Sequence, residues 1–92
     1  MASESFLISE ELQRYLEAHA PMPDRVQRSL ITTTGEKVGA LSMMQVGFTQ
    51  GAFMEMIVAL LAPSFAVEVG TFTGYSALGI ARNLPVGGRL LC

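Results

Sequence analysis

The sequence predicts a small α/β protein in which helices precede a single strand–helix–strand unit. Apolar residues recur with helical spacing through the first two thirds of the chain. A short, β-branched apolar run follows at 65–69, which is typical of a buried parallel strand. A glycine-bearing turn at 70–74 then leads to a helix of small residues and a second apolar run at 89–92. This order over about 30 residues is that of a βαβ unit.

Length and composition limit the class of protein. Ninety-two residues allow one small domain. Half of them are apolar and only 15% are charged, which argues against disorder. The net charge of −2 and the lack of any Lys/Arg cluster disfavour a nucleic-acid partner. One cysteine, Cys92, and one histidine, His19, leave no basis for a cysteine-rich or histidine-built metal site. The apolar content exceeds what so short a domain usually hides, so we expect that partner surface is missing.

Targeting to a membrane is not expected. The most apolar stretch, 53–62, is interrupted by Glu55, ended by Pro63, and shorter than the roughly 20 residues that a span requires. Residues 1–9 carry no basic region and include Glu4, so they do not resemble a secretion signal. The expected location is therefore the cytoplasm.

Three helices are expected in the first 63 residues. The first runs from Glu10 to Ala20, capped by Ser9, and ends at the prolines that follow. The second covers 24–32 with Asp24 as its cap, and the threonines and glycines of 32–39 predict a turn.

The third expected helix covers 50–61 with Thr49 as its cap, while 41–47 fits either an apolar element or a loop. We expect one domain, with residues 1–63 as a helical N-terminal region and 64–92 as the first βαβ unit.

The turn after the first predicted strand carries the chemistry. A glycine-bearing turn at the carboxyl end of a strand is where doubly wound folds bind nucleotides. Dinucleotide sites need G-x-G-x-x-G, but here Phe72 stands where the second glycine would be, and the spacing of Gly70 and Gly74 is G-x-x-x-G. Glu68 would repel a phosphate and suit a cationic amino group. S-adenosylmethionine fits both the turn and the acid, because it is a nucleoside compound that carries an ammonium group and no phosphate. Alternatively, Glu68 only accepts backbone N–H groups of the turn.

The chain resembles the small class I S-adenosylmethionine-dependent O-methyltransferases, the group of the catechol and caffeoyl-CoA O-methyltransferases. The resemblance is most specific in the run from Glu68 to Leu78. The segments that carry it are Gln50-Gly51-Ala52-Phe53, Glu68-Val69-Gly70-Thr71-Phe72-Thr73-Gly74-Tyr75-Ser76-Ala77-Leu78, and Leu84-Pro85 with Gly88-Arg89. It implies a Rossmann-like methyltransferase fold, of which this chain would hold only the N-terminal helices and the first βαβ unit.

The resemblance also implies six cofactor-binding residues. Glu68 resembles the acid near the methionine amino group, and Ser76 resembles the hydroxyl that contacts the methionine carboxylate. Two more positions, Gly70 and Phe72, look like those beside the methionyl and ribose parts. Met44 and Val46 are similar to the segment that closes over the cofactor, although both could simply be core residues.

For the whole enzyme, the resemblance implies methyl transfer to a hydroxyl of a small, catechol-like aromatic acceptor, with help from a divalent metal such as Mg²⁺. It also implies a homodimer. The chain would cover somewhat under half of such an enzyme and half of its cofactor site, so we expect it to be inactive alone. No catalytic residue or metal ligand is expected here. We interpret Asp24 and Glu55 as capping or solvated residues, His19 as a packing residue, and Cys92 as part of a strand core.

Two alternatives remain from the sequence. The chain could be a non-catalytic association module, stabilised by dimerisation or domain swapping through unpaired strands and uncovered helix faces. It could also be a nicotinamide-binding βαβ unit, against which Phe72 at the glycine position argues.

Overall fold

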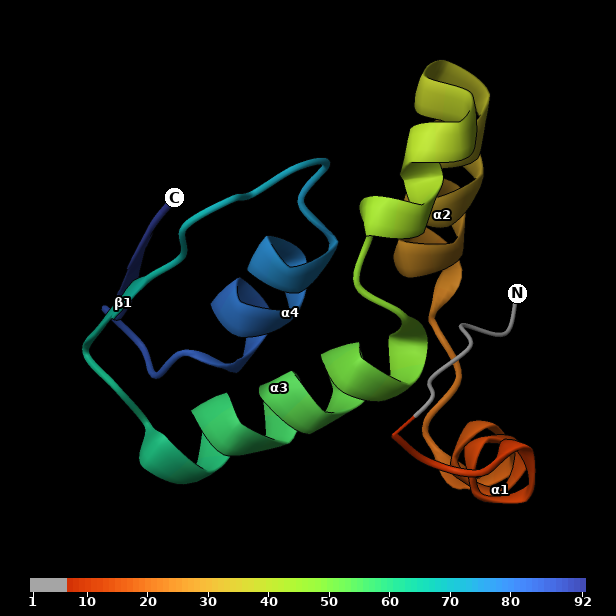
Figure 1. The fold of residues 1–92 in the computed structure, drawn as a ribbon. Coiled ribbons are helices and arrows are strands. Elements are labelled where there is room, and N and C mark those ends of the chain that lie inside the picture. The colour runs from red at the N-terminus through yellow and green to blue at the C-terminus, as the bar shows by residue number, and fades with distance from the viewer. Residues whose placement is uncertain (1–6) are drawn as a thin grey trace.

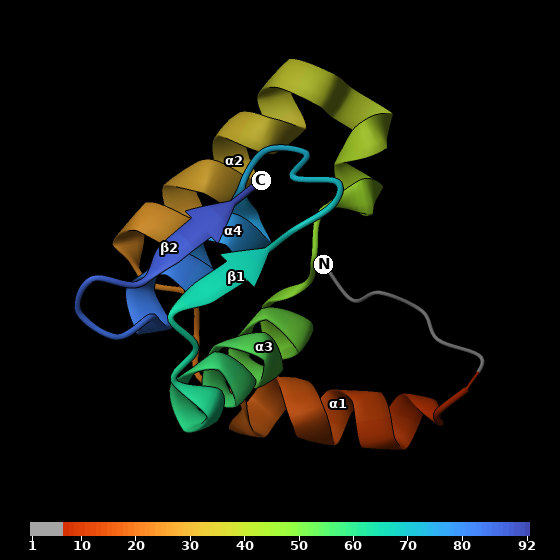
Figure 2. The same ribbon diagram turned by 90° about the vertical axis from the view of Figure 1, so that its left-hand side faces the viewer.

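The computed structural model describes residues 7–92, which form helices and one small sheet (Figure 1). The elements are α1 (Glu10–His19), α2 (Arg25–Val38), the short 3₁₀ helix η1 (Gly39–Met44), α3 (Phe48–Leu61), β1 (Phe65–Val67), α4 (Tyr75–Asn83) and β2 (Arg89–Leu91). Helix α4 covers one face of the sheet, and α3 runs along α4 (Figure 2). The mixed helix and strand content agrees with the expected α/β class.

The strand–helix–strand unit is confirmed, and its two strands are parallel. Phe65 pairs with Arg89, Ala66 with Leu90 and Val67 with Leu91. Each strand is shorter than expected, at three residues. The expected strand residue Val69 lies beyond the paired region and is 94% exposed. The ladder still extends by one bond, because the N–H of Glu68 donates to the carbonyl of Leu91 at 2.8 Å.

Two of the predicted helix caps are confirmed. The hydroxyl of Ser9 accepts the N–H of Leu12 at 3.1 Å, and α1 ends at His19, one residue before the predicted end. The side chain of Asp24 accepts the N–H of Gln27 at 2.9 Å, while the Gln27 side chain accepts the N–H of Asp24. This reciprocal pair is a capping box, which satisfies two N–H groups that the first turn of a helix leaves free.

The prediction of a turn at 32–39 was wrong. Helix α2 continues to Val38 and ends at Gly39, whose φ of 57° favours glycine. Threonine is a modest helix former, but tertiary contacts override propensity. Here Thr34 is buried and hydrogen-bonded.

The start of the third helix was also predicted wrongly. Helix α3 begins at Phe48, and its cap is Gly47, which makes no side-chain cap bond, rather than Thr49. The undecided segment before it is the 3₁₀ helix η1, followed by Gln45 in an extended conformation.

Small residues let α3 and α4 approach closely. A Cβ atom on Gly51 would lie 2.9 Å from the ring of Tyr75, and one on Gly79 would lie 3.0 Å from Glu55 Cγ. Both distances are shorter than an ordinary contact, so a larger residue at either position would require the neighbouring side chain to shift. The contact places Tyr75, which is 4% exposed, between the two helices.

Much apolar surface of residues 7–92 stays exposed, as the composition led us to expect. The buried large apolar side chains of this part of the chain are Tyr75 and Ile80. Cys92 is exposed, so the prediction that it belongs to a strand core was wrong, because it lies one residue beyond the end of β2. In residues 7–92, no one helix has both the length and the apolar character for a membrane span. Among the described residues, the segments Arg25–Met44 and Phe48–Leu61 have this length and apolar character only when they are taken together, and they are bent by 79° relative to each other.

Candidate cofactor site

The turn between β1 and α4 has an unusual backbone. Gly70 and Gly74 have φ values of 85° and 97°, which glycine adopts without strain. Phe72 has a φ of 52°, a conformation that costs a bulky residue about 1–3 kcal/mol and that is typical of functional sites. The N–H of Gly74 donates to the carbonyl of Thr71 at 3.0 Å, which closes the turn just before α4 begins.

This turn faces η1 and the segment that follows it (Figures 1 and 2). A hollow lies between them, with a volume of about 230 Å³ that includes space open to solvent. Its lining residues are Met44, Gln45, Val46, Gly70, Thr71, Phe72, Thr73, Tyr75 and Ser76. The enclosed part of this space is far smaller than the about 300–1,000 Å³ of a pocket for a drug-sized ligand, so these residues supply at most part of such a site.

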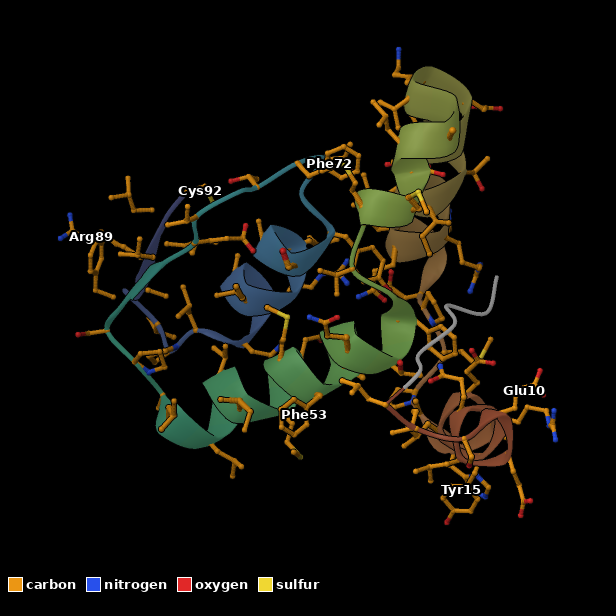
Figure 3. All side chains as sticks on the ribbon, viewed as in Figure 1. Glu10, Tyr15, Phe53, Phe72, Arg89 and Cys92 are labelled. Atoms are coloured by element: carbon orange, nitrogen blue, oxygen red, sulfur yellow. The ribbon has the colours of Figure 1, made fainter. Side chains whose placement is uncertain are left out.

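Five of the six residues predicted to bind the cofactor line this hollow. Met44 and Val46 come from the segment before α3, Gly70 and Phe72 from the turn, and Ser76 from the first turn of α4. Figure 3 labels Phe72, whose side chain lies where the turn approaches η1. The structure thus brings together two segments that are more than 20 residues apart in the sequence.

The sixth predicted residue, Glu68, does not line the hollow but is bonded to Ser76, which does. The Ser76 hydroxyl donates to Glu68 Oε2. The other carboxylate oxygen, Oε1, is buried and has no hydrogen-bond partner among residues 7–92. An unsatisfied buried acceptor of this kind costs about 1–3 kcal/mol, so it favours the approach of a donor. The alternative that Glu68 caps backbone N–H groups of the turn is not what is seen, since its observed partner is a side-chain hydroxyl.

Sequence reasoning missed three residues beside the hollow. The amide of Gln45 donates to the hydroxyls of Thr34 and Thr73, at 3.1 Å each, and the hydroxyl of Thr34 donates to that of Thr73 at 3.0 Å. We call this the Thr34–Gln45–Thr73 cluster. The polar Gln45 between the apolar Met44 and Val46 could have suggested it. Thr34 was hidden by the wrong prediction of a turn at that position.

The acids outside the hollow have ordinary structural partners. Glu55 accepts hydrogen bonds from the amides of Gln27 at 3.3 Å and Asn83 at 3.2 Å, so it bridges helices and is not merely solvated. Asp24 forms an ion pair with Arg82 at 2.5 Å on the protein surface. The pKa of the Asp24 carboxyl is lowered, first by the N–H of Gln27 and also by Arg82.

Two aromatic side chains with ionisable groups, Tyr75 and His19, lie outside these acid clusters. Burial raises the pKa of Tyr75, and the charges of Glu55 and Asp24 act in the same direction. His19 is exposed and stacks on the Tyr15 ring of its own helix, with 4.0 Å between the ring centroids, so its predicted role in helix packing is not seen among residues 7–92. Within residues 7–92, no three His, Cys, Asp or Glu side chains gather in a way that could hold a metal ion.

The fold and the hollow define an α/β protein with a candidate ligand site at the carboxyl end of its first strand, where such folds bind ligands. A family model described as O-methyltransferase matches residues 17–92. The chain therefore belongs to the O-methyltransferase family.

Individual relatives agree with this assignment. The chain is 34% identical to the caffeoyl-CoA O-methyltransferase of Populus kitakamiensis over 92 residues, which cover 98% of this chain and 39% of the relative. It is 36% identical to the catechol O-methyltransferase of Mus musculus over 84 residues, covering 89% and 31%. A flavonoid 3',5'-methyltransferase of Vitis vinifera is 32% identical over 87 residues, covering 92% and 37%. The chain thus spans less than half the length of these relatives.

Proposed function

We propose that this chain forms one side of the S-adenosylmethionine site of an O-methyltransferase with a Rossmann-like fold. The complete enzyme would transfer the methyl group to a hydroxyl of a small, catechol-like aromatic acceptor. The observation that carries the proposal is the convergence of Met44, Val46, Gly70, Phe72 and Ser76 on one hollow. Family membership supports the choice of methyl donor, because an O-methyltransferase needs one.

The polar groups at the hollow fit such a donor. Glu68 does not itself line the hollow, but its buried Oε1 has no partner among residues 7–92 and is an acceptor suited to an ammonium group, while Ser76, which lines the hollow, holds the other oxygen of the same carboxylate. Ser76 also lies in the first turn of α4, where unpaired N–H groups and the helix dipole favour a carboxylate. The ammonium group of the donor's amino-acid part would therefore meet the acceptor Glu68, and its carboxylate would meet the N–H donors at the start of α4.

The turn itself supports a ligand without a diphosphate. A pyrophosphate needs a glycine that lets it approach the backbone, but Phe72 brings a bulky side chain to that position. Glu68 would add repulsion between negative charges. A sulfonium compound carries no phosphate, so neither feature opposes it. When bound, the donor supplies an electrophilic methyl group, and the role proposed for these residues is to hold it in a fixed orientation.

A divalent metal remains part of the proposal for the complete enzyme, on the strength of the family resemblance. Residues 7–92 contain no cluster of ligands that fits one, so we derive no step through it. We also propose a homodimer and a cytoplasmic location. The exposed apolar side chains of α3, such as Phe53 and Leu60, support a need for further covering surface.

A binding measurement on the complete protein tests the donor site. In Glu68→Gln, the carboxylate charge is lost but the shape is kept, so we expect S-adenosylmethionine to bind at least tenfold more weakly in calorimetry, as for a lost charge-assisted bond. Glu36→Gln, which removes an exposed charge on α2, is the matched control and should bind as the unchanged protein does. Equal affinity in the Glu68 variant would refute the proposed ammonium contact. Tighter binding of a nicotinamide dinucleotide than of S-adenosylmethionine would refute the proposed cofactor.

A further inference from the structure

Three polar side chains connect the two walls of the hollow. We infer that the Thr34–Gln45–Thr73 cluster positions the turn of residues 70–74 against the Met44–Val46 segment, and so sets the width of the ligand site. This inference rests on the proposed function, because it assigns the cluster a role in holding the donor.

The cluster is built from three separate parts of the chain. Thr34 lies in the C-terminal half of α2 and is 2% exposed. Gln45 stands between Met44 and Val46, which line one wall of the hollow, and Thr73 directly follows Phe72 on the other wall. Each hydrogen bond of the cluster measures 3.0–3.1 Å. The walls are therefore joined to each other and both are anchored to a helix.

The bonds restrain one another. Gln45 Nε2 lies 3.1 Å from both hydroxyl oxygens, which are themselves 3.0 Å apart, so its amide is shared between the two hydroxyls, and Thr73 Oγ1 accepts from both Gln45 and Thr34. A hydroxyl offers two acceptor positions, so those of Thr73 are filled. Each of the three side chains takes part in two bonds, and none can rotate without breaking both. Such a closed set specifies one arrangement of the backbone.

The backbone next to the cluster needs such support. Phe72 has a φ of 52°, and a conformation like this persists only where the surroundings hold it. Thr73, the next residue, is fixed by the cluster, while Phe72 itself lines the hollow. Loss of the cluster would therefore let the turn relax and move Phe72 away from the position that the hollow requires.

The first test is binding of S-adenosylmethionine to variants of the complete protein, measured by calorimetry. Thr34→Val keeps the shape but removes the hydroxyl, and Gln45→Met removes the amide, so each should raise the Kd about tenfold. Thr34→Ser restores the hydroxyl and should bind within twofold of the unchanged protein. Thr33→Val, an exposed neighbour on the same helix, is the matched control and should also stay within twofold.

Unchanged affinity in both Thr34→Val and Gln45→Met would overturn the inference. If Thr34→Val does not fold, Gln45→Met decides alone, because Gln45 lies outside the helices. If the unchanged protein binds no S-adenosylmethionine, the proposed function fails. The positioning role of the Thr34–Gln45–Thr73 cluster is then decided by a second measurement, made without ligand.

That second measurement is hydrogen exchange at the Gly74 amide, which closes the turn. We expect exchange about tenfold faster in Thr34→Val and Gln45→Met, and unchanged in Thr34→Ser and Thr33→Val. Equal rates in all variants would overturn the inference. So would an acceleration spread evenly along α2, because that pattern would mark a role in stability and not in positioning.

Discussion

Helices α1 and α4 show two ways in which this chain makes a helix. Helix α1 has no buried residue, and its apolar side chains, such as Leu12 and Tyr15, are largely exposed. Helix α4 buries four of its nine residues, including Tyr75 and Ser76, between α3, the sheet and the hollow. The first helix depends on local interactions and the second on its neighbours. The contrast teaches that the candidate site is built where tertiary packing is tightest.

The largest difference between the two helices should come from their tyrosines. Tyr75→Ala removes a ring that is 4% exposed and should lower the free energy of unfolding by about 3 kcal/mol, as large-to-small changes in a core do. Tyr15→Ala removes a ring that is 59% exposed and should cost no more than about 0.5 kcal/mol. Urea unfolding followed by circular dichroism measures both values. Equal losses would show that α4 is no more tightly packed than α1.

A pair of glycines sharpens the same comparison. Gly51→Ala would place a methyl group 2.9 Å from the Tyr75 ring, and the cost of overpacking, about 1–3 kcal/mol, should exceed the gain in helix propensity of about 1 kcal/mol. Gly35→Ala meets nothing within 4 Å and should stabilise α2 by up to about 1 kcal/mol. Thermal unfolding of both variants gives the signs. Stabilisation by Gly51→Ala would contradict the close approach of α3 and α4.

The cap of α1 tests its local character. Ser9→Ala removes the hydroxyl that accepts the Leu12 N–H and should destabilise α1 by about 1 kcal/mol. Because no residue of α1 is buried, the rest of the protein should hardly respond. Hydrogen exchange should become about fivefold faster at the amides of α1 and stay unchanged in α4. A parallel change in α4 would mean that the two helices unfold together.

The smallest effect concerns pH. The pKa of Asp24 in the folded protein lies below its ordinary value of 3.8, first because of the Gln27 N–H. A lowered pKa adds stability that is present above about pH 4 and is lost as the pH falls through the folded value. Asp24→Asn keeps an acceptor for the cap but does not titrate.

The difference in Tm between the unchanged protein and Asp24→Asn should therefore shrink as the pH falls from 6 to below 3. Arg82→Met should retain part of this dependence, because the backbone bond from Gln27 is the largest cause. Thermal unfolding across this pH range measures it. A constant difference in Tm would contradict the lowered pKa.

Local chemistry made several elements predictable. Ser9 and Asp24 mark helix starts because a side-chain oxygen can satisfy free N–H groups wherever a helix begins. The βαβ order followed from the apolar runs and the glycine turn, which need no knowledge of distant residues. The residues of the hollow followed from the resemblance of one short run and the segment before α3, and the structure places five of the six on one surface.

Other features were decided by contacts between distant residues. The threonines of α2 favour a turn locally, but Thr34 reaches Gln45 and Thr73, and α2 continues past it to Val38. Likewise, nothing local shows that Gly51 faces Tyr75 or that Glu55 bridges Gln27 and Asn83.

The sequence by itself determined the caps of α1 and α2, the strand–helix–strand order and the kind of turn that follows the first strand, because these depend on backbone preferences within a few residues. The tertiary structure alone decided where α2 ends, how closely α3 approaches α4 and how Gln45 joins the two walls of the hollow. Those features depend on side chains that are far apart in the chain, and their hydrogen bonds and contacts exist only after the helices have packed.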